Sequence, residues 1–524
     1  MSHLRRFRSL SSLLLLCTLI LSACGGTPAV TNPTTAPVAT TAPVATTAPV
    51  ATTAPVATTA PAATTAVTEA VTTAPAEITA AAEVTVAPPT PTQVNVSTFN
   101  KADAAGRKVV RWFVGLGAGT QPPQITAQET FVKTYNASQD QIYLSLEIVG
   151  NETAYEVLAT QIAAGSAPDL IGPVGYRGIS SFQAQILNLS DLITKNKVDL
   201  SVYDESLVKF YQNDQAQLGL PFAVYPSFLF LNKDLFEEAD VPLPPQKFGE
   251  MYNGKPWDMN ALRELALTLT VDDQGNDATA AGFNPEKIVQ FGFNPQWGTD
   301  PRAEATLFGA ASIVGSDGKA QIPANWTAAW KWFYDGMFGQ QRFIPNQSYL
   351  DSQLLSGNAW NTGNVAIGYT HLWYTCCADN VKNWDVAVVP TYDGNVTAKL
   401  HADTFAILNS TKDQDAAFAV LQSLLNSNEL LELYGAFPAK KAEQASFIQT
   451  LNTKFAPNTV NWQVAIDSLQ YVDTPNHEAN MPNFREAADA IQSFGTLYHS
   501  TPGLDVDAEA SKLKTELDTI FAKQ

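Results

Sequence analysis

The stretch GLPFAVYPSFLFLNKDLF, residues 219–236, holds a continuous apolar run at Phe228–Leu231 that has the character of a buried β-strand. Runs of this kind alternate with segments of helical period throughout residues 101–524, a length at which a single hydrophobic core usually divides. Such alternation is typical of an α/β fold, in which helices cover a β-sheet, and not of a β-sandwich. The other predicted strands are Lys108–Val114, Ile142–Val149, Val365–Tyr369, Val386–Val389 and Phe405–Leu408.

Helices are predicted where apolar residues recur with a period of about 3.6. In the clearest case, apolar residues at positions 262, 265, 266 and 269 follow Asp258, which is expected to be the N-cap residue. Two more helices are expected around Phe418–Leu425 and Leu513–Phe521. The tryptophans expected to pack on a helix face are Trp326, Trp330 and Trp332. Because ligands of open α/β sheets bind on loops at the carboxyl ends of strands, the binding residues are expected on such loops.

The composition excludes several classes of protein. Apolar residues make up 45% and charged residues 15% of the chain, which allows a large buried core and rules out a wholly disordered chain. The net charge is −19, and residues 25–100 hold three acidic residues and no basic residue, so the acidity belongs to the remainder of the chain. Because duplex nucleic acid requires a concentrated basic surface, it is not an expected partner.

The first 23 residues are predicted to be a signal peptide. Three arginines at positions 5, 6 and 8 precede the apolar run Leu10–Leu21, which is shorter than the roughly 20 residues of a membrane span. The run ends in LSAC, residues 21–24, which resembles the bacterial lipoprotein box. That resemblance implies lipidation of Cys24 and an extracytoplasmic protein anchored to the cell membrane by lipid alone. The alternative is an ordinary secretory signal in which the cysteine has no such role.

Residues 24–100 are predicted to form a disordered tether. From Ala36 the chain repeats the sequence Ala-Pro-Val-Ala-Thr-Thr, so that a proline recurs at every sixth residue and blocks helices and interior strands. The segment also has too little apolar surface to offset the entropy lost on ordering. It is expected to be extended and partly polyproline-like, and about 3.1 Å per residue would let it reach roughly 230 Å.

Several segments of the body, in order, resemble the extracellular solute-binding proteins of the maltose-binding type, which are receptors for ABC importers. The most specific similarity is GLPF at 219–222 followed by LNKDLF at 231–236. The other similar segments are VVRWF (109–113) with GLGAG (115–119), APDL (167–170), WD (257–258), GNVAIG (363–368) through Trp373, AILNS (406–410) and YGAFPAK (434–440). Each motif alone is weak, and their order along the chain is what makes the resemblance specific.

The resemblance implies a two-lobed α/β fold of the periplasmic-binding-protein type II, with a hinge and the ligand between the lobes. By motif position, lobe I takes residues 101–223 and 404–450, and lobe II takes 224–403 and 451–524. The implied function is capture of a carbohydrate and its delivery to the permease subunits of an ABC transporter by a monomeric receptor. No enzymatic activity and no cofactor are expected. One alternative is the same fold with a polyamine or peptide cargo. Another is a surface glycoside hydrolase, because the separation of its two catalytic carboxylates is set in space and is not visible in the sequence.

Five of the candidate ligand residues come from this resemblance and carry rings or polar tips suited to a sugar. Trp373 stands where the family commonly has a tryptophan that stacks on a sugar, and Tyr374 follows it in the same loop. Tyr225 takes the place of a glutamate that contacts ligand in maltose-binding relatives, so that specificity is not preserved. Tyr176 and Arg177 follow the APDL strand, where relatives carry an acid and a basic residue.

Other candidates keep two readings open. Gly115 and Gly117 offer bare backbone that either approaches a ligand or forms a tight turn. Trp297 either contributes an aromatic ring to the ligand or packs in the core. Asp403 either accepts a hydrogen bond from a sugar hydroxyl or serves as a helix cap or ion-pair partner.

The cysteines and the remaining chemistry-bearing residues complete the predictions. Cys376 and Cys377 are adjacent, and either a vicinal disulfide stiffens the ligand loop or both are free thiols. The five histidines have no zinc spacing, so no metal site is expected. Residues 272–277 have the look of a calcium loop but lack the glycine and glutamate positions of an EF-hand, which favours a turn. Sequence motifs of metalloproteases, serine hydrolases and P-loops are absent.

Overall fold

The computed structural model describes residues 95–524, apart from 214–215, 297–299, 480 and 524. The predicted signal peptide, the lipidation site at Cys24 and most of the predicted tether therefore lie outside the described residues. Within the described residues, no helix combines the length and the apolar composition that crossing a membrane requires.

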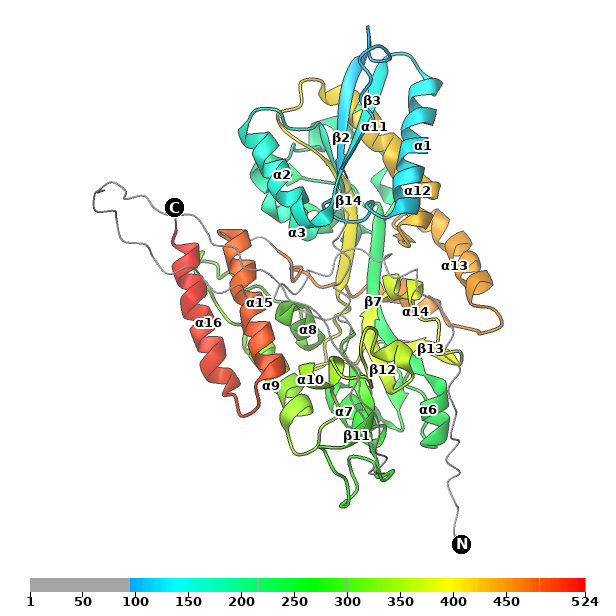
Figure 1. The fold of residues 1–524 in the computed structure, drawn as a ribbon, viewed down its shortest axis with the longest axis vertical. Coiled ribbons are helices and arrows are strands. Elements are labelled where there is room, and N and C mark those ends of the chain that lie inside the picture. Colours follow the sequence, from blue (N-terminus) through cyan, green and yellow to red (C-terminus); the bar gives the residue numbers. More distant parts are fainter. Residues whose placement is uncertain (1–94, 214–215, 297–299, 480, 524) are drawn as a thin grey trace, which may run out of the picture. The chain divides into compact units, whose positions relative to one another are not determined.

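The upper part of Figure 1 contains a sheet whose central strands are parallel, and we call this sheet with its helices the upper lobe. β2 (Lys108–Val114) pairs in parallel with β3 (Ile142–Val149) on one side and with β4 (Leu170–Gly175) on the other. β1 (Asn95–Ser97) pairs antiparallel with β3 at the edge of the sheet. The bounds of β2 and β3 are those predicted, because each apolar run ends at a glycine.

Helices cover both faces of this sheet. Because successive side chains of a strand point to opposite faces, Trp112 packs with α1 (Pro122–Ser138) and α11 (Gln414–Leu425), whereas Phe113 packs on the side of α2 (Asn151–Ala163). The indole Nε1 of Trp112 donates a hydrogen bond of 2.6 Å to the carbonyl oxygen of Gly172, so the ring is buried without an unpaired polar atom.

Two strands run from the upper lobe into the lower part of the molecule (Figure 1). β14 (Leu400–Ile407) pairs antiparallel with two strands. Its residues 403–407 pair with β4, and its residues 400–403 pair with β7 (Ala223–Asn232). Residues 227–231 of β7 continue downward and pair with β12 (Val365–His371). All ten residues of β7 are buried, which agrees with the continuous apolar run at 228–231.

The strands beyond β7 and their helices form what we call the lower lobe. β12 is parallel to β11 (Ile288–Asn294), β10 (Val271–Asp272) closes that edge, and β13 (Trp384–Ala387) pairs with β7. The predicted strand 386–389 is therefore real but shifted by two residues, since it begins at Trp384 and ends at Ala387. It begins at Trp384 because that buried ring stacks on Phe230 of β7 at a centroid distance of 5.5 Å.

Two helices of the lower lobe confirm predictions made from the sequence. The Asp258 carboxylate accepts hydrogen bonds from the backbone N–H groups of residues 260 and 261 and caps α7 (Met259–Thr268). Trp326 and Trp330 are fully buried on α9 (Ala324–Phe338), and Trp332 is half-buried against the same core. The last helices are α15 (Phe484–Ser500) and α16 (Val506–Phe521).

The remaining elements are short and mostly connect those above. They are α3 (Tyr176–Ser181), α4 (Ser190–Lys195), α5 (Glu205–Phe210), α6 (Lys233–Glu238), α8 (Pro301–Ala305), α10 (Gln347–Leu350), α12 (Asn428–Leu433), α13 (Lys441–Phe455), α14 (Gln463–Ser468), the strands β5 (Gln212–Asn213), β6 (Ala216–Gln217), β8 (Met251–Tyr252), β9 (Lys255–Pro256) and β15 (Phe437–Pro438), and the single turns η1 (Gln183–Gln185), η2 (Leu200–Val202), η3 (Thr306–Phe308), η4 (Trp360–Thr362) and η5 (Leu372–Cys376).

Residues 95–100, which the composition assigns to the tether, belong to the folded body. Beyond β1, Thr98 donates its backbone N–H to the carbonyl of Leu146 at 3.0 Å, and its hydroxyl accepts from the N–H of the same residue at 2.9 Å. The N–H of Asn100 donates to the hydroxyl of Tyr143 at 2.9 Å. Composition does not reveal this pairing with residues far away in the sequence, because residues 95–100 resemble the preceding linker in polarity.

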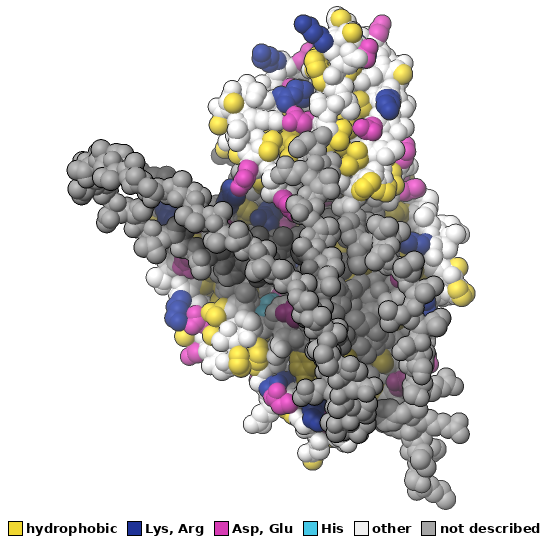
Figure 2. All heavy atoms as spheres, viewed as in Figure 1, with side chains coloured by type: hydrophobic (Ala, Val, Ile, Leu, Met, Phe, Trp, Pro, Cys, Tyr) yellow, Lys and Arg dark blue, Asp and Glu magenta, His cyan; other side chains and the backbone are white. Residues whose placement is uncertain are grey.

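The observed architecture is the predicted two-lobed α/β fold. The assignment of each residue to a lobe stays a prediction. On the part of the face in Figure 2 that grey atoms leave visible, acidic and basic side chains are interspersed and do not gather into one basic patch.

Candidate functional site

The candidate site lies where β14 and β7 pass between the two lobes, a region we call the junction. His401 and Asp403 are two residues apart on β14, so their side chains project from the same face. His401 is in register with Tyr225 of β7, and Asp403 is in register with Gly175 at the end of β4. The crossing of the strands therefore brings residues of both lobes to one place.

Trp373 lies at this junction, in the turn η5 that follows β12. Its partly exposed ring has centroid distances of 4.3 Å to His371, 4.9 Å to His401 and 5.5 Å to Tyr225. The structure thus brings together two predicted ligand residues, Trp373 and Tyr225, with two histidines that were not predicted to belong to a site.

Tyr225 is more enclosed than the sequence suggests. Its ring is buried, and its hydroxyl donates a hydrogen bond of 3.4 Å to the backbone carbonyl of Tyr434. Burial, followed by the nearby negative charge of Asp403, raises the pKa of Tyr225 well above its ordinary value. Its hydroxyl is therefore neutral and engaged within the protein, and its ring packs against that of Trp373.

Tyr374 differs from the expectation that it belongs to the ligand loop surface. Its ring is fully buried in the lower lobe, with centroid distances of 5.3 Å to Phe230 and 5.8 Å to Trp360. Its hydroxyl donates to the side-chain oxygen of Asn358. Adjacent residues of the turn η5 point in different directions, so Trp373 reaches the junction while Tyr374 fills the core.

The two predicted glycines have different surroundings. A Cβ atom on Gly115, whose φ is +139°, would lie 2.3 Å from the carbonyl oxygen of Val149, so a tight turn and close packing explain that glycine. A Cβ atom on Gly117 would lie 2.9 Å from the carbonyl oxygen of Pro173 and 3.5 Å from Oδ2 of Asp403. Of the two glycines, Gly117 is the one whose backbone lies beside a polar side chain of the junction.

Tyr176 and Arg177 begin α3, directly after β4. The half-buried ring of Tyr176 packs edge-on against Phe210 at 5.1 Å, and burial followed by the charge of Glu478 raises its pKa. Arg177 is exposed, and its guanidinium lies 5.8 Å from the ring centroid of Tyr155. Tyr176 and Arg177 thus directly follow Gly175, the residue of β4 that is in register with Asp403.

Asp403 is the acidic group of β14 at the junction. Burial, reinforced by the negative charge of Glu478, raises the pKa of Asp403 to about 7. Within the described part of the chain, its carboxylate receives no hydrogen bond and forms no ion pair, and it caps no helix. Of the two readings left open by the sequence, the arrangement favours a carboxyl group that can still accept a hydrogen bond from a ligand.

Three histidines that are far apart in the sequence converge beside these residues. The ring of His401 lies 4.5 Å from that of His371 and 4.9 Å from that of His477, between centroids. Burial, aided by neighbouring positive charge, lowers the pKa of His371 and of His401 well below the ordinary value, so both rings are neutral. These histidines are dispersed along the sequence and meet because β12, β14 and the segment before α15 lie side by side in the folded chain.

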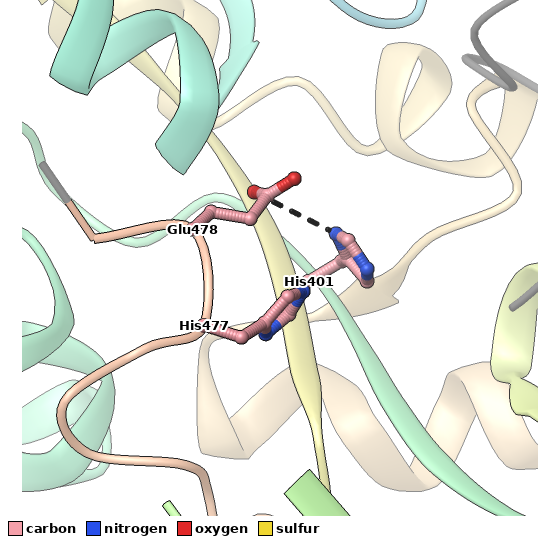
Figure 3. A group of neighbouring side chains, drawn as sticks. All are labelled: His401, His477 and Glu478. Atoms are coloured by element: carbon pink, nitrogen blue, oxygen red, sulfur yellow. Dashed lines mark ion pairs between the residues drawn. The ribbon is translucent and has the colours of Figure 1, made fainter. Parts of the chain in front are cut away.

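One group at the junction has the donor types of a metal site. A ring nitrogen of His401, a ring nitrogen of His477 and a carboxylate oxygen of Glu478 all lie within 4.8 Å of one another. Figure 3 shows His477 and Glu478 on one loop, and His401 facing the Glu478 carboxylate from β14, with Nδ1 3.8 Å from Oε2. Sequence spacing gave no signal of this group.

Several predictions find no test at this site. Trp297 and Cys24 lie outside the described residues. Cys377 is disulfide-bonded, but the side chain of Cys376 is outside the described part of the structure, so the vicinal disulfide stays a prediction. The carboxylate of Asp272 accepts hydrogen bonds from the backbone N–H groups of residues 274, 276 and 284 at 2.8–2.9 Å, so the calcium-like segment is a turn held by its own acid.

Comparison with known proteins adds the family context. The family model for bacterial extracellular solute-binding proteins matches residues 117–428, more than half of the chain. Among curated proteins, a binding-protein relative from Brucella abortus (strain 2308) is 28% identical over 130 residues. That match covers 24% of this chain and 30% of the relative, so the similarity spans less than a third of that protein.

Solved structures of similar fold cover most of this chain. MalE, a sugar-binding protein of Xanthomonas citri, has a TM-score of 0.60 at 16% identity, covering 79% of this chain and 98% of MalE. UspC of M. tuberculosis has a TM-score of 0.60 at 18% identity, covering 79% and 100% of the two chains. The ABC substrate-binding protein Lmo0181 of Listeria monocytogenes, in complex with cycloalternan, has a TM-score of 0.56 at 18% identity, covering 79% and 98%.

Proposed function

This chain belongs to the family of bacterial extracellular solute-binding proteins, and on that premise we propose that it captures a carbohydrate at the junction and delivers it to an ABC permease. The members of this family are binding receptors and not enzymes. The cargo is released as it was bound, with no bond made or broken.

The arrangement around Asp403 is the observation that carries the carbohydrate proposal. Its carboxylate lies beside the bare backbone of Gly117 and close to Tyr225, on which Trp373 packs. A sugar needs an apolar ring surface for its C–H face and an acceptor for its hydroxyl groups, and this group supplies both. MalE is a sugar-binding protein and Lmo0181 was solved with cycloalternan, which supports the same class of cargo.

The position of the junction also suits capture by lobe closure. Gly117 of the upper lobe lies beside Asp403 of the crossing strand β14, and Trp373 reaches His401 of the same strand from the lower lobe. A solute that contacts both lobes binds the closed arrangement better than the open one, and that difference in affinity drives closure. The permease would then recognise the closed arrangement.

The test is a thermal-shift screen of the full chain against a carbohydrate panel and a polyamine panel. A carbohydrate at 100 times its dissociation constant should stabilise the protein by about 2.7 kcal/mol. Trp373→Ala should remove most of this shift. Asp403→Asn, which preserves shape, should weaken binding at least about 10-fold at a pH above the Asp403 pKa of about 7, where the carboxylate is charged, because hydrogen bonds to charged groups contribute roughly 1.5–3 kcal/mol.

Phe99→Ala is the matched control, because this exposed aromatic residue follows β1 at the far edge of the upper sheet. Its ligand response should equal that of the parent. If Trp373→Ala and Asp403→Asn also respond like the parent, the site is wrongly placed. A shift with polyamines and none with carbohydrates would replace the proposed cargo.

We also propose that Cys24 carries the lipid that holds the receptor at the outer face of the cell membrane, through the tether that precedes Asn95. The support is the LSAC sequence at 21–24 and the extracellular character of the family. Cys24→Ser should move the protein from the detergent phase to the aqueous phase on detergent partitioning of expressing cells. Retention of the variant in the detergent phase would contradict the anchor.

A further inference from the structure

We propose that His401, His477 and Glu478 form a binding site for a divalent transition-metal ion of the zinc class at the junction. One nitrogen from each histidine and one carboxylate oxygen lie within 4.8 Å of one another (Figure 3). Imidazole nitrogen and carboxylate oxygen are both zinc ligands, and three protein ligands with one open position are a common arrangement of accessible zinc sites. This inference is independent of whether the captured solute is a carbohydrate.

The surroundings of His477 are those of a metal-binding histidine. Its Nδ1 lies 2.7 Å from Oδ2 of Asp473, and both side chains are almost completely buried. The same carboxylate also accepts from the backbone N–H of His477 at 2.9 Å and, through Oδ1, from that of Leu400 at 2.8 Å, which fixes its position. With the proton held on Nδ1 by the carboxylate, Nε2 presents a lone pair, as in carboxylate–histidine–zinc groups.

Within the described residues, no group donates a hydrogen bond to this lone pair. Nε2 of His477 is buried and has no hydrogen-bond partner. Buried polar atoms are nearly always paired, so an orphan atom aimed into a cluster of donors indicates a missing ligand. Nε2 of His371 is a second such atom, and the ring of His371 lies 4.5 Å from the ring of His401.

His401 and Glu478 form the accessible side of the group. Their side chains are 23% and 19% exposed, so an ion can reach them, whereas His477 is 1% exposed and forms the floor. The 3.8 Å between Nδ1 of His401 and Oε2 of Glu478 is too long for a hydrogen bond. Ligands at about 2.0–2.2 Å from a tetrahedral ion lie near 3.5 Å apart, so small side-chain rotations bring the three atoms into range.

The charges around the group permit a cation. Glu478 and Asp473 each contribute a carboxylate, and Asp403 lies two residues from His401 on the same face of β14. Lys399 is the opposing charge: it is buried, and its Nζ sits 4.9 Å over the ring of Tyr369. Two carboxylates in or directly behind the ligand set thus offset the one lysine.

The test uses the full chain, freed of metal with a chelator and dialysed, and titrated with ZnCl₂ in a calorimeter. We expect one equivalent of Zn²⁺ to bind with micromolar or tighter affinity. His401→Ala and Glu478→Gln should each weaken binding more than about 10-fold, because loss even of outer-shell partners costs 10–100-fold. CoCl₂ in place of ZnCl₂ should give the visible absorption of a cobalt ion held by nitrogen and oxygen ligands, and the two variants should lose it.

The matched controls are His499→Gln and Glu486→Gln. His499 lies on α15 and pairs with Glu304 at 3.1 Å, and Glu486, on the same helix, pairs with Lys523. Both variants should bind Zn²⁺ like the parent. A folded parent that binds no Zn²⁺, or site variants that bind as tightly as the controls, would overturn the inference. Carbohydrate shifts measured with chelator present keep this outcome separate from failure of the proposed function.

Discussion

The sheet of the upper lobe and the strands of the junction bury their side chains in opposite ways. On β2, the inward residues are apolar, and the one polar atom of Trp112 is paired with a carbonyl oxygen. At the junction, His371 and Lys399 are each 3% exposed, and Nε2 of His371 has no partner. Burial of ionisable or unpaired polar groups costs stability, so the upper sheet favours folding, whereas the junction carries a cost that the proposed binding role would explain.

The largest expected effect tests the folding side of this comparison. Trp112→Ala removes a fully buried ring at the centre of the upper sheet and should reduce the free energy of unfolding by about 3–5 kcal/mol. Urea denaturation followed by circular dichroism measures it. Phe99→Ala, at an exposed position, should stay within about 0.5 kcal/mol of the parent. If Trp112→Ala lowers the free energy of unfolding by less than about 0.5 kcal/mol, the upper sheet tolerates a cavity, and its contrast with the junction is lost.

The next effect tests the binding side. Asp473→Asn keeps the size of a residue that positions His477 but removes its negative charge. Zn²⁺ affinity should fall by about 10–100-fold, because outer-shell carboxylates orient and strengthen histidine ligands. Calorimetric titration at a temperature where the variant is folded separates this from stability. An unchanged Zn²⁺ affinity would show that Asp473 only accepts hydrogen bonds from backbone N–H groups and does not orient His477 for metal binding.

A smaller effect of opposite sign is expected at His371. His371→Leu replaces a buried imidazole that has an unpaired nitrogen by an apolar side chain. The empty protein should be unchanged or more stable by about 1 kcal/mol, because an unsatisfied polar atom is removed from the interior. The denaturation midpoint of the metal-free protein measures this. A clear destabilisation would indicate that His371 is already well accommodated, and would weaken the contrast between the two regions.

The smallest effect is expected at an exposed link between the lobes. Arg485 of α15 and Glu156 of α2 form an ion pair at 2.8 Å, with side chains 76% and 61% exposed. Exposed pairs contribute only about 0.2–1 kcal/mol, so Arg485→Ala should change solute affinity less than about 5-fold, and high salt should abolish the difference. A larger, salt-resistant change would place part of the closure energy outside the junction.

The sequence predicts the upper sheet well and the junction poorly, for a physical reason. β2 and β3 are local apolar runs, and each ends where its sequence changes to glycine. His371, His401 and His477 meet only because β12, β14 and the segment before α15 cross in space. No local pattern records such a meeting.

Trp373 and Tyr374 show the same limit at the scale of one residue. Both rings are aromatic side chains of the same turn, η5. The ring of Trp373 packs against His371 and His401 at the junction, whereas the ring of Tyr374 is buried in the core. The resemblance to a known family placed the turn, but the direction of each ring depends on backbone geometry that the letters do not carry. The tether boundary differs for the same reason, since β1 is defined by its partner on β3.

The three-residue strand β1 has a practical consequence for anyone shortening this chain. It occupies the otherwise open hydrogen-bonding edge of β3, and strand edges of that kind are templates for pairing between molecules. A chain that begins at residue 101, where the low-complexity composition stops, would lack β1 and expose the edge of β3, and is expected to aggregate through that edge. Trimming to residue 93 would leave it in place and should yield soluble, well-dispersed protein.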